Sequence, residues 1–205
     1  MSLKNTADRW GPVSQSLHWL VVLLIIGQGI VGLTMGDLRN GLDKIQIYAL
    51  HKSFGLTILG LVTLRLLWRW FAGTPLPVPG TPTWKKRIAS LSHWGLYALL
   101  FAIPISGWVL NSVAGFPLQW FGLINLPDII DKNDGLREAA RDLHGALFWI
   151  LIGLALVHAA AAFYHHLFQH DATLARMFPR GWLKVGNATD HTVIEGIRNE
   201  DRHNA

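Results

Sequence analysis

Four long apolar blocks limit what this chain can fold into more than any other feature of its sequence. They cover residues 15–35, 47–71, 88–113 and 143–168. Each block has about the 20 residues or more that a helix needs to cross a bilayer core. Apolar residues fill the blocks instead of recurring at amphipathic spacing, which indicates helices that face lipid. We therefore expect an all-α fold, a transmembrane bundle of four helices.

The composition supports a membrane protein and narrows the chemistry it can perform. Charged residues make up only 15% of the chain, whereas about a quarter of a soluble domain is charged. The first block could instead be a signal peptide, but it is long and no small-residue cleavage site follows it. The chain has no cysteine, which excludes disulfides, thiolate-bound clusters and covalent c-type haem attachment. Any cofactor must therefore be held by His, Met, carboxylates or non-covalent packing.

The segments between the blocks have distinct compositions. Residues 73–82 are rich in proline and predict a stiff, extended connector. Residues 114–142 form a long segment that begins with Gly and Pro and predicts a short amphipathic helix near its end. After Pro179 the chain is polar. We expect one transmembrane domain over residues 1–180 and a polar cytoplasmic tail over residues 181–205.

The basic residues outside the blocks are divided unevenly between the two sides of the membrane. Twelve Lys and Arg residues lie on the side of both termini and six on the other, where seven acidic residues dilute them. The positive-inside rule therefore predicts that both termini are cytoplasmic. The excess of basic residues is then explained by membrane orientation and not by nucleic-acid binding. We expect membrane lipid, and no nucleic acid, as a partner. Tryptophans near the predicted helix ends are typical of an aromatic belt: Trp19, Trp68, Trp70, Trp84, Trp94, Trp120 and Trp182.

Histidines inside these blocks are the strongest functional signal, because ionisable residues in membrane helices are rare and usually functional. His144 and His158 are fourteen residues apart in the fourth block, so both rings project from one helix face about 21 Å apart along the axis. Given the alternating direction of the helices, His18 lies at the inner level with His158. His51 lies at the outer level with His144.

Two facing histidines at each level match what two b-type haems require, namely two imidazoles from different helices with apolar walls around the macrocycle. A zinc site would need three or four ligands at one point, which the separation on the fourth helix forbids. The other alternative is that the histidines only bind lipid headgroups. Because four of them pair by level, we predict iron ligation by His18, His51, His144 and His158.

The remaining histidines have less defined roles. His93 falls at the inner level and could be an alternative haem ligand, a quinone contact or a headgroup contact. His165 and His166 are expected at the interface, where one of them could touch a quinone, and we expect His170, His191 and His203 in solvent. Small residues beside the predicted ligands would offer a flat macrocycle a thin surface, although they also let helices pack without a cofactor: Gly55, Gly145 and residues 159–162.

Basic residues near the predicted haem levels suggest a role for charge. On the outer side, Lys52, Arg137 and Arg141 could pair with haem propionates or steer an anion such as superoxide. Their alternative role is to snorkel to phosphate headgroups. On the inner side, Arg9, Arg65 and Arg69 could hold the other propionates or serve as positive-inside anchors.

Several short motifs resemble those of the bacterial cytochrome b561 family. They are SLHWL at residues 16–20, LHKSFG at 50–55, LH at 143–144, His158 with the alanines that lead to His165 and His166, and DATLARM at 171–177. The resemblance covers about residues 8–180 with consistent order and spacing. It implies a di-haem, four-helix cytochrome of the bacterial inner membrane, with His18 and His158 binding one haem and His51 and His144 the other.

The resemblance also implies a function. One member of the family transfers electrons from periplasmic superoxide to ubiquinone, and related subunits pass electrons from a partner enzyme to quinone. We expect an oxidoreductase that moves electrons from an outer donor, superoxide above all, to membrane ubiquinone. The alternative is a non-catalytic relay subunit that docks on a periplasmic redox protein. A transporter or structural protein without haem would leave the paired histidines unexplained.

Overall fold

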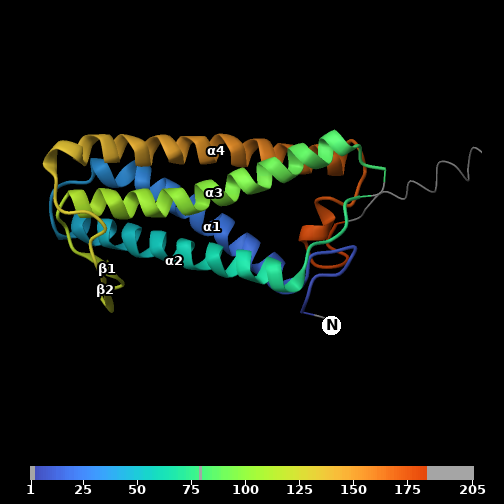
Figure 1. The fold of residues 1–205 in the computed structure, drawn as a ribbon, viewed down its shortest axis with the longest axis horizontal. Helices are drawn as coiled ribbons and strands as arrows, with labels where there is room; N and C mark the ends of the chain where they lie inside the picture. Colours follow the sequence, from blue (N-terminus) through green and yellow to red (C-terminus); the bar gives the residue numbers. More distant parts are fainter. Residues whose placement is uncertain (1–2, 79, 184–205) are drawn as a thin grey trace, which may run out of the picture.

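Four long helices run side by side in an elongated bundle (Figure 1), in a computed structural model that describes residues 3–78 and 80–183. They are α1 (Pro12–Thr34), α2 (Leu42–Ala72), α3 (Thr83–Val113) and α4 (Arg137–Leu167). All four are long and apolar enough to cross a membrane. The predicted all-α bundle of four membrane helices is confirmed.

The helices begin earlier than the apolar blocks. α2 and α3 each start five residues before their block, and α4 starts six residues before residue 143. A short 3-10 helix, η2 (Asp134–Leu136), leads directly into α4. The amphipathic helix expected near residue 142 is therefore not a separate element but the first turns of α4. Polar residues can extend these helices because the backbone hydrogen bonds continue outside the hydrocarbon core.

The helices bury few side chains among themselves. A small core joins α1, α2 and α3 through Val21, Ile58, Val62 and Tyr97. Most other large apolar side chains on the bundle, including Leu23 and Leu156, are exposed at the protein surface. Exposed leucines on membrane helices face hydrocarbon that is as apolar as they are, so this surface suits a bilayer.

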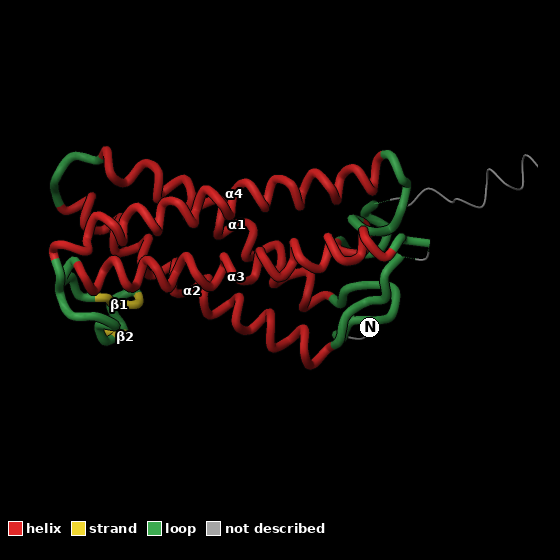
Figure 2. The backbone as a smooth tube through the Cα atoms, turned by 45° about the horizontal axis from the view of Figure 1, so that its top comes forward, coloured by secondary structure: helices red, strands yellow, loops and turns green. Residues whose placement is uncertain are grey.

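A β-hairpin lies alongside the bundle, beside α2 (Figures 1 and 2). Its strands β1 (Leu118–Trp120) and β2 (Ile124–Leu126) pair antiparallel. Phe121 and Gly122 in the turn have positive φ angles of 51° and 71°, a conformation typical of tight hairpin turns. This hairpin was not predicted from the sequence. We call the end of the bundle near it the hairpin end.

The opposite end of the bundle is closed by three chain segments that are far apart in sequence (Figure 1). We call them the terminal cap: residues 3–11, the connector residues 73–78, and residues 170–179, which include the 3-10 helix η3 (Ala175–Met177). The amide of Leu76 donates to the carbonyl of Ala7 at 2.8 Å, and Arg176 donates to the carbonyl of Leu76 at 2.7 Å. The three segments therefore form one hydrogen-bonded unit.

The terminal cap is also bound to the first turns of α1. The side-chain amide of Gln15 donates to the carbonyls of Arg176 and Phe178, and the indole of Trp19 donates to the carbonyl of Met177 at 2.9 Å. Trp19 also packs on the ring of Phe178. The helix turn that carries His18 is thus held by the last described segment of the chain. The predicted tail over residues 181–205 lies outside the described residues from residue 184 onward, and its boundary stays a prediction.

Candidate functional site

Five half-buried histidines lie within the bundle in two groups. The first group, which we call the hairpin-end pair, is His51 on α2 and His144 on α4. The second, which we call the cap-end cluster, is His18 on α1, His93 on α3 and His158 on α4. α4 is one continuous helix and carries one histidine of each group, His144 and His158.

The two rings of the hairpin-end pair face each other across the bundle. Their centres are 6.4 Å apart and their planes are at 85°. A metal ion bound by one nitrogen of each ring, at the usual distance of about 2 Å, would separate the ring centres by roughly 6 Å. The spacing therefore suits two axial ligands of one metal ion.

The hydrogen bonds of His144 determine which of its nitrogens is free. The hydroxyl of Ser106 on α3 lies 2.9 Å from Nδ1 of His144 and donates its own proton to the carbonyl of Ile103 at 2.8 Å. Ser106 must therefore accept a hydrogen bond from Nδ1–H of His144, which leaves Nε2 with its lone pair. Histidines that bind metals are typically oriented by such a bond from the other ring nitrogen.

Two glycines allow neighbouring helices to approach these rings closely. A Cβ atom added to Gly32 on α1 would lie 3.2 Å from the His51 ring, and one added to Gly107 on α3 would lie 3.1 Å from the His144 ring. The glycines that the sequence analysis named are elsewhere, since a Cβ added at Gly55 or Gly145 would meet no atom within 4 Å. The thin surfaces that seat the two rings come from α1 and α3, because the contacts are made between helices.

The cap-end cluster brings together three histidines where two were predicted to pair. The rings of His93 and His158 are 5.3 Å apart, and the ring of His18 packs edge-on against Trp19 at 5.2 Å. Electrostatic interactions connect His18 with both His93 and His158. The pairing of His18 with His158 remains a prediction. His93 lies close enough to His158 to be its partner ligand instead of His18.

Arg65 brings a positive charge into the cap-end cluster. It follows His51 by fourteen residues on α2, so it projects from nearly the same helix face about 21 Å further along, and its charge acts on His18, His93 and His158. Its Nε donates to the hydroxyl of Tyr97 at 3.1 Å, while Nη1 is buried with no hydrogen-bond partner among the described residues. A buried guanidinium without an acidic partner is costly in a membrane. The guanidinium of Arg65 would therefore suit an anionic partner at this position, such as a haem propionate.

The other basic residues on the cap side have partners of their own. The guanidinium of Arg69 lies 5.8 Å from the ring centres of Trp10 and Trp94, a cation–π arrangement. Arg9 donates to the carbonyl of Ala175 in the terminal cap. Their predicted role as propionate partners is not tested by these contacts.

The basic residues at the hairpin end also differ from one another. The ammonium of Lys52 donates to the side-chain carbonyl of Asn111 and to the carbonyl of Pro117, both at 3.1 Å, so it ties the start of the hairpin segment to α2. Arg137 lies over the ring of Phe116, with 5.7 Å to its centre, and Arg141 is exposed. Their predicted role in steering an anion stays a prediction, for which Arg141 is the most accessible of the three.

At the other end of α4, His165 is paired with a carboxylate. Its Nδ1 lies 2.6 Å from Asp171, and the amide of Thr173 donates to the same carboxylate at 2.8 Å. Burial acts to raise the pKa of Asp171, but the hydrogen bonds from Thr173 and His165 together outweigh it and leave that pKa below its usual value. Nδ1 of the neighbouring His166 is buried with no partner among the described residues. His191 and His203 lie outside the described residues.

The hairpin-end pair fits a b-type haem by the chemistry of its ligands. Nε2 of His144 is free to bind, and Nδ1 of His51 is buried without a hydrogen-bond partner among the described residues. Across the described ranges, no group of three or more His, Asp or Glu side chains, the cap-end cluster included, has the arrangement of a site for a bare metal ion. Two facing histidines are the protein's share of the ligands of a haem iron, because the macrocycle supplies the rest.

Residues 9–180 match the family model described as prokaryotic cytochrome b561. The chain belongs to this family. It is 34% identical over 188 residues to cytochrome b561 homolog 2 of Escherichia coli (strain K12), which covers 91% of this chain and all of that protein. It is 28% identical over 180 residues to cytochrome b561 homolog 1 of the same organism, with coverage of 84% and 98%. A protein named probable superoxide oxidase CybB, from Yersinia pestis, is 32% identical over 170 residues, with coverage of 80% and 92%.

Membership of the cytochrome b561 family assigns a general role to the histidines. The protein is a membrane cytochrome that uses haem b in electron transport. The predicted family and the four predicted membrane helices are confirmed. Ser106, Gly32 and Gly107 were not predicted, because no short motif distinguishes them from ordinary small residues of membrane helices. Only their contacts across the bundle reveal a role.

Proposed function

We propose that this chain is a di-haem cytochrome that transfers electrons from a periplasmic donor, superoxide above all, to ubiquinone in the membrane. The observation that carries the proposal is the hairpin-end pair, with ring centres 6.4 Å apart and the tautomer of His144 set by Ser106. His51 and His144 would hold one haem b. His18 and His158 would hold the other, with His93 close by.

The fourteen-residue spacing of His144 and His158 supports two haems rather than one. The two histidines are separated by about 21 Å along α4, so no single macrocycle can use both. Haem, when bound, supplies one-electron redox chemistry. The chain's own residues orient the ligands, exclude water and set the local charge.

Superoxide as the donor is supported by one relative and by the chemistry of the couple. A relative 32% identical to this chain is named probable superoxide oxidase CybB. Oxidation of superoxide releases one electron and dioxygen, and two such electrons with two protons convert ubiquinone to ubiquinol. A donor that is an anion would be drawn by exposed positive charge at the hairpin end, where Arg141 is accessible.

The orientation that this function needs is the one that the charge distribution favours. The N-terminal segment and the end of α4 lie at the same end of the bundle (Figure 1). Twelve of the eighteen Lys and Arg residues are assigned to that side, so we propose that the cap end faces the cytoplasm and the hairpin end faces the periplasm of the bacterial inner membrane.

Stopped-flow reduction of the purified, haem-loaded protein by superoxide tests the proposed function. Fast reduction that is abolished by superoxide dismutase, followed by reoxidation on adding ubiquinone, is the expected result. The matched control is His144→Ala, which should be reduced no faster than background if the hairpin-end haem receives the electron. Two haems per chain with background reduction in the unaltered protein would contradict superoxide as donor and favour a relay subunit for a periplasmic redox protein.

A further inference from the structure

The β-hairpin lies at the depth of the hairpin-end pair and not above it. The amide of Phe121 donates to the hydroxyl of Ser53 at 3.0 Å, and the indole of Trp120 donates to the hydroxyl of Thr57 at 3.1 Å. Ser53 and Thr57 follow His51 by two and six residues on α2, which places them about 3 and 9 Å deeper along the helix. The tip of the hairpin is therefore level with residues inside the candidate membrane span of α2.

The hairpin has the composition of a segment in contact with lipid. Residues 115–127 contain no Asp, Glu, Lys or Arg. Leu123 and Ile124 are 77% and 55% exposed. Exposure of these apolar side chains favours contact with hydrocarbon over water, while the polar pair Gln119 and Asn125, also exposed, suits a position near the headgroups.

Several backbone groups of the hairpin have protein partners, as a non-helical segment in a membrane requires. Such a segment is tolerated only where protein partners satisfy its polar groups. The two strands pair with each other from Leu118 to Leu126. The hydroxyl of Ser53 accepts from the amide of Phe121 and lies 3.2 Å from the carbonyl of Gln119. Ser53 thus joins α2 to the inner edge of the hairpin by accepting from Phe121, while its own proton is shared between the carbonyls of Ala49, at 2.9 Å, and Gln119.

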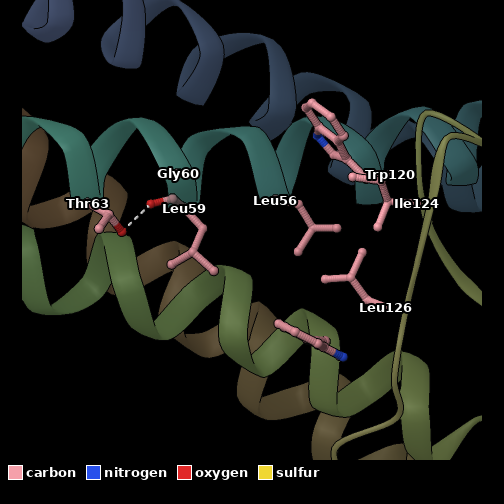
Figure 3. A pocket seen from close by; sticks show the side chains of 8 residues that line it. Leu56, Leu59, Gly60, Thr63, Trp120, Ile124 and Leu126 are labelled. Carbon is pink, nitrogen blue, oxygen red and sulfur yellow. Dashed lines mark hydrogen bonds between the residues drawn. The ribbon is translucent and has the colours of Figure 1, made fainter.

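A groove of about 420 Å³ lies between the hairpin, α2 and α3 (Figure 3). Its walls are almost entirely apolar, and on α2 the face that lines it is turned away from the face that carries His51. The lining residues are Leu56, Leu59, Gly60, Thr63, Trp108, Trp120, Ile124 and Leu126. The groove is therefore on the lipid side of the bundle and separate from the histidine groups.

The polar groups around this groove are already engaged. The indole of Trp108 donates to the carbonyl of Pro127 at 3.0 Å, and the indole of Trp120 donates to Thr57. The hydroxyl of Thr63 donates to the carbonyl of Leu59 at 2.8 Å, the bond drawn in Figure 3. No free donor is thus left among these residues for the carbonyl oxygens of a quinone ring, whereas a plain hydrocarbon chain needs none.

We propose that the hairpin is a re-entrant element of the periplasmic leaflet and that the groove beneath it holds an acyl chain of a membrane phospholipid. The hairpin and α2 form two walls and α3 the third, so the chain is enclosed on three sides and open to the bilayer. The assignment to the periplasmic leaflet rests on the orientation proposed above, whereas the groove itself is independent of electron transfer, because its lining residues are not in the histidine groups.

Spin labelling tests the depth of the hairpin, and the absence of cysteine makes each label unique. We would label Leu123→Cys and Ile124→Cys in the haem-loaded protein in phospholipid nanodiscs and compare accessibility to oxygen with accessibility to a water-soluble nickel complex. Leu64→Cys, on the exposed face of α2, is the lipid reference, and Lys132→Cys, beyond the hairpin, is the water reference. The hairpin labels should behave as Leu64→Cys does. Behaviour like that of Lys132→Cys would overturn the proposal.

Native mass spectrometry tests the groove itself. Gly60→Leu fills the groove, and an added Cβ at Gly60 meets no atom within 4 Å, so the backbone can accept it. The matched control is Gly27→Leu on α1, where a Cβ is equally free and no groove wall is touched. We expect one phospholipid retained by the unaltered protein and the control and lost from the Gly60→Leu variant.

Two outcomes of this experiment would contradict the groove assignment. One is equal phospholipid retention in both variants. The other is retention of ubiquinone in place of phospholipid. Haem absorbance of each sample verifies that the bundle is intact, and Leu56→Trp, which fills the groove from a second position, replaces Gly60→Leu if that variant loses haem.

Discussion

The two histidine groups of this cytochrome differ in how fully their ligands are defined. The hairpin-end pair has one histidine on each of two helices, with one ring fixed by Ser106 and both rings packed against glycines. The cap-end cluster has three histidines from three helices and a half-buried arginine beside them. The hairpin-end pair therefore offers a metal ion one pair of histidines, whereas the cap-end cluster offers three histidines from which two would be chosen.

This difference has a consequence for the direction of electron flow. A positive charge near a haem stabilises its reduced form, which carries one positive charge less. Arg65 supplies such a charge at the cap-end cluster, whereas the ammonium of Lys52 at the hairpin end is turned to Asn111 and Pro117. With a haem in each group, as proposed above, the charge of Arg65 would favour electron movement from the hairpin end to the cap end.

Removal of a ligand of the hairpin-end pair should have the largest effect. His144→Ala or His51→Ala leaves a single axial ligand, so haem content should fall from about two per chain to about one. A pyridine haemochrome assay measures it, and His170→Ala, outside both groups, is the control. Loss of both haems in either variant would show that the two groups are not independent.

Substitution of two histidines in the cap-end cluster separates ligand from neighbour. His18→Ala should lose the cap-end haem, while His93→Ala should retain both haems with a shifted spectrum, because His93 is expected beside the haem and not on its iron. Low-temperature absorbance and haem stoichiometry distinguish the two variants. The reverse pattern, with haem lost only from His93→Ala, would replace the predicted pair by His93 and His158.

Loss of the hydrogen bond to His144 should weaken one site without abolishing it. Ser106→Ala removes the acceptor of Nδ1–H, and such outer partners of metal ligands typically account for about 10–100-fold in affinity. We expect faster haem loss to an acceptor globin from the hairpin-end site and an unchanged cap-end site. Ser106→Thr keeps the hydroxyl and should restore the slow rate. Equal loss rates in the unaltered protein and Ser106→Ala would refute this role.

The charge of Arg65 should be visible as a redox potential. Arg65→Gln removes the charge, so the midpoint potential of the cap-end haem should fall by roughly tens of millivolts. Arg65→Lys keeps the charge and should leave the potential near its original value. Spectroelectrochemical titration resolves the two haems. A shift of the hairpin-end haem instead would mean that the arginine acts on the other site.

The smallest predicted effect concerns the His165–Asp171 pair at the cap end. Because the folded pKa of Asp171 is lowered, the carboxylate stabilises the fold fully above its ordinary pKa of about 4, and this contribution is lost as the pH falls through the lower folded value. Asp171→Asn should lower the thermal midpoint by about 2 °C at neutral pH. The difference should shrink below about pH 4, and a difference that persists there would exclude ionisation as its cause.

The sequence predicts the helices and the levels of the histidines because both depend on local rules. Hydrophobic length marks a membrane helix, and the helical repeat sets the fourteen-residue spacing of His144 and His158. α2, α3 and α4 begin five or six residues before the apolar blocks, because polar residues continue each helix beyond the hydrocarbon core. The β-hairpin was missed because its pairing is stabilised by Ser53, a residue more than sixty positions away.

The details of the histidine groups were less predictable for a similar reason. Ser106 and Gly107 lie on α3 and act on a histidine of α4, and Gly32 acts from α1 on a histidine of α2. A sequence motif records neighbours along one chain segment, and these contacts join different segments. The choice between His18 and His93 depends on the same kind of information, which is why it needs the two-variant experiment.

The position of α4 in both histidine groups has a consequence for biosynthesis. His144 and His158 are the α4 members of the two groups, and the terminal cap that holds the start of α1 is formed by residues that follow α4. While the ribosome is still making the first three helices, neither group has its last histidine. Both proposed ligand pairs are therefore complete only after the final helix has been inserted, and a chain interrupted before residue 137 should carry no haem at the hairpin end.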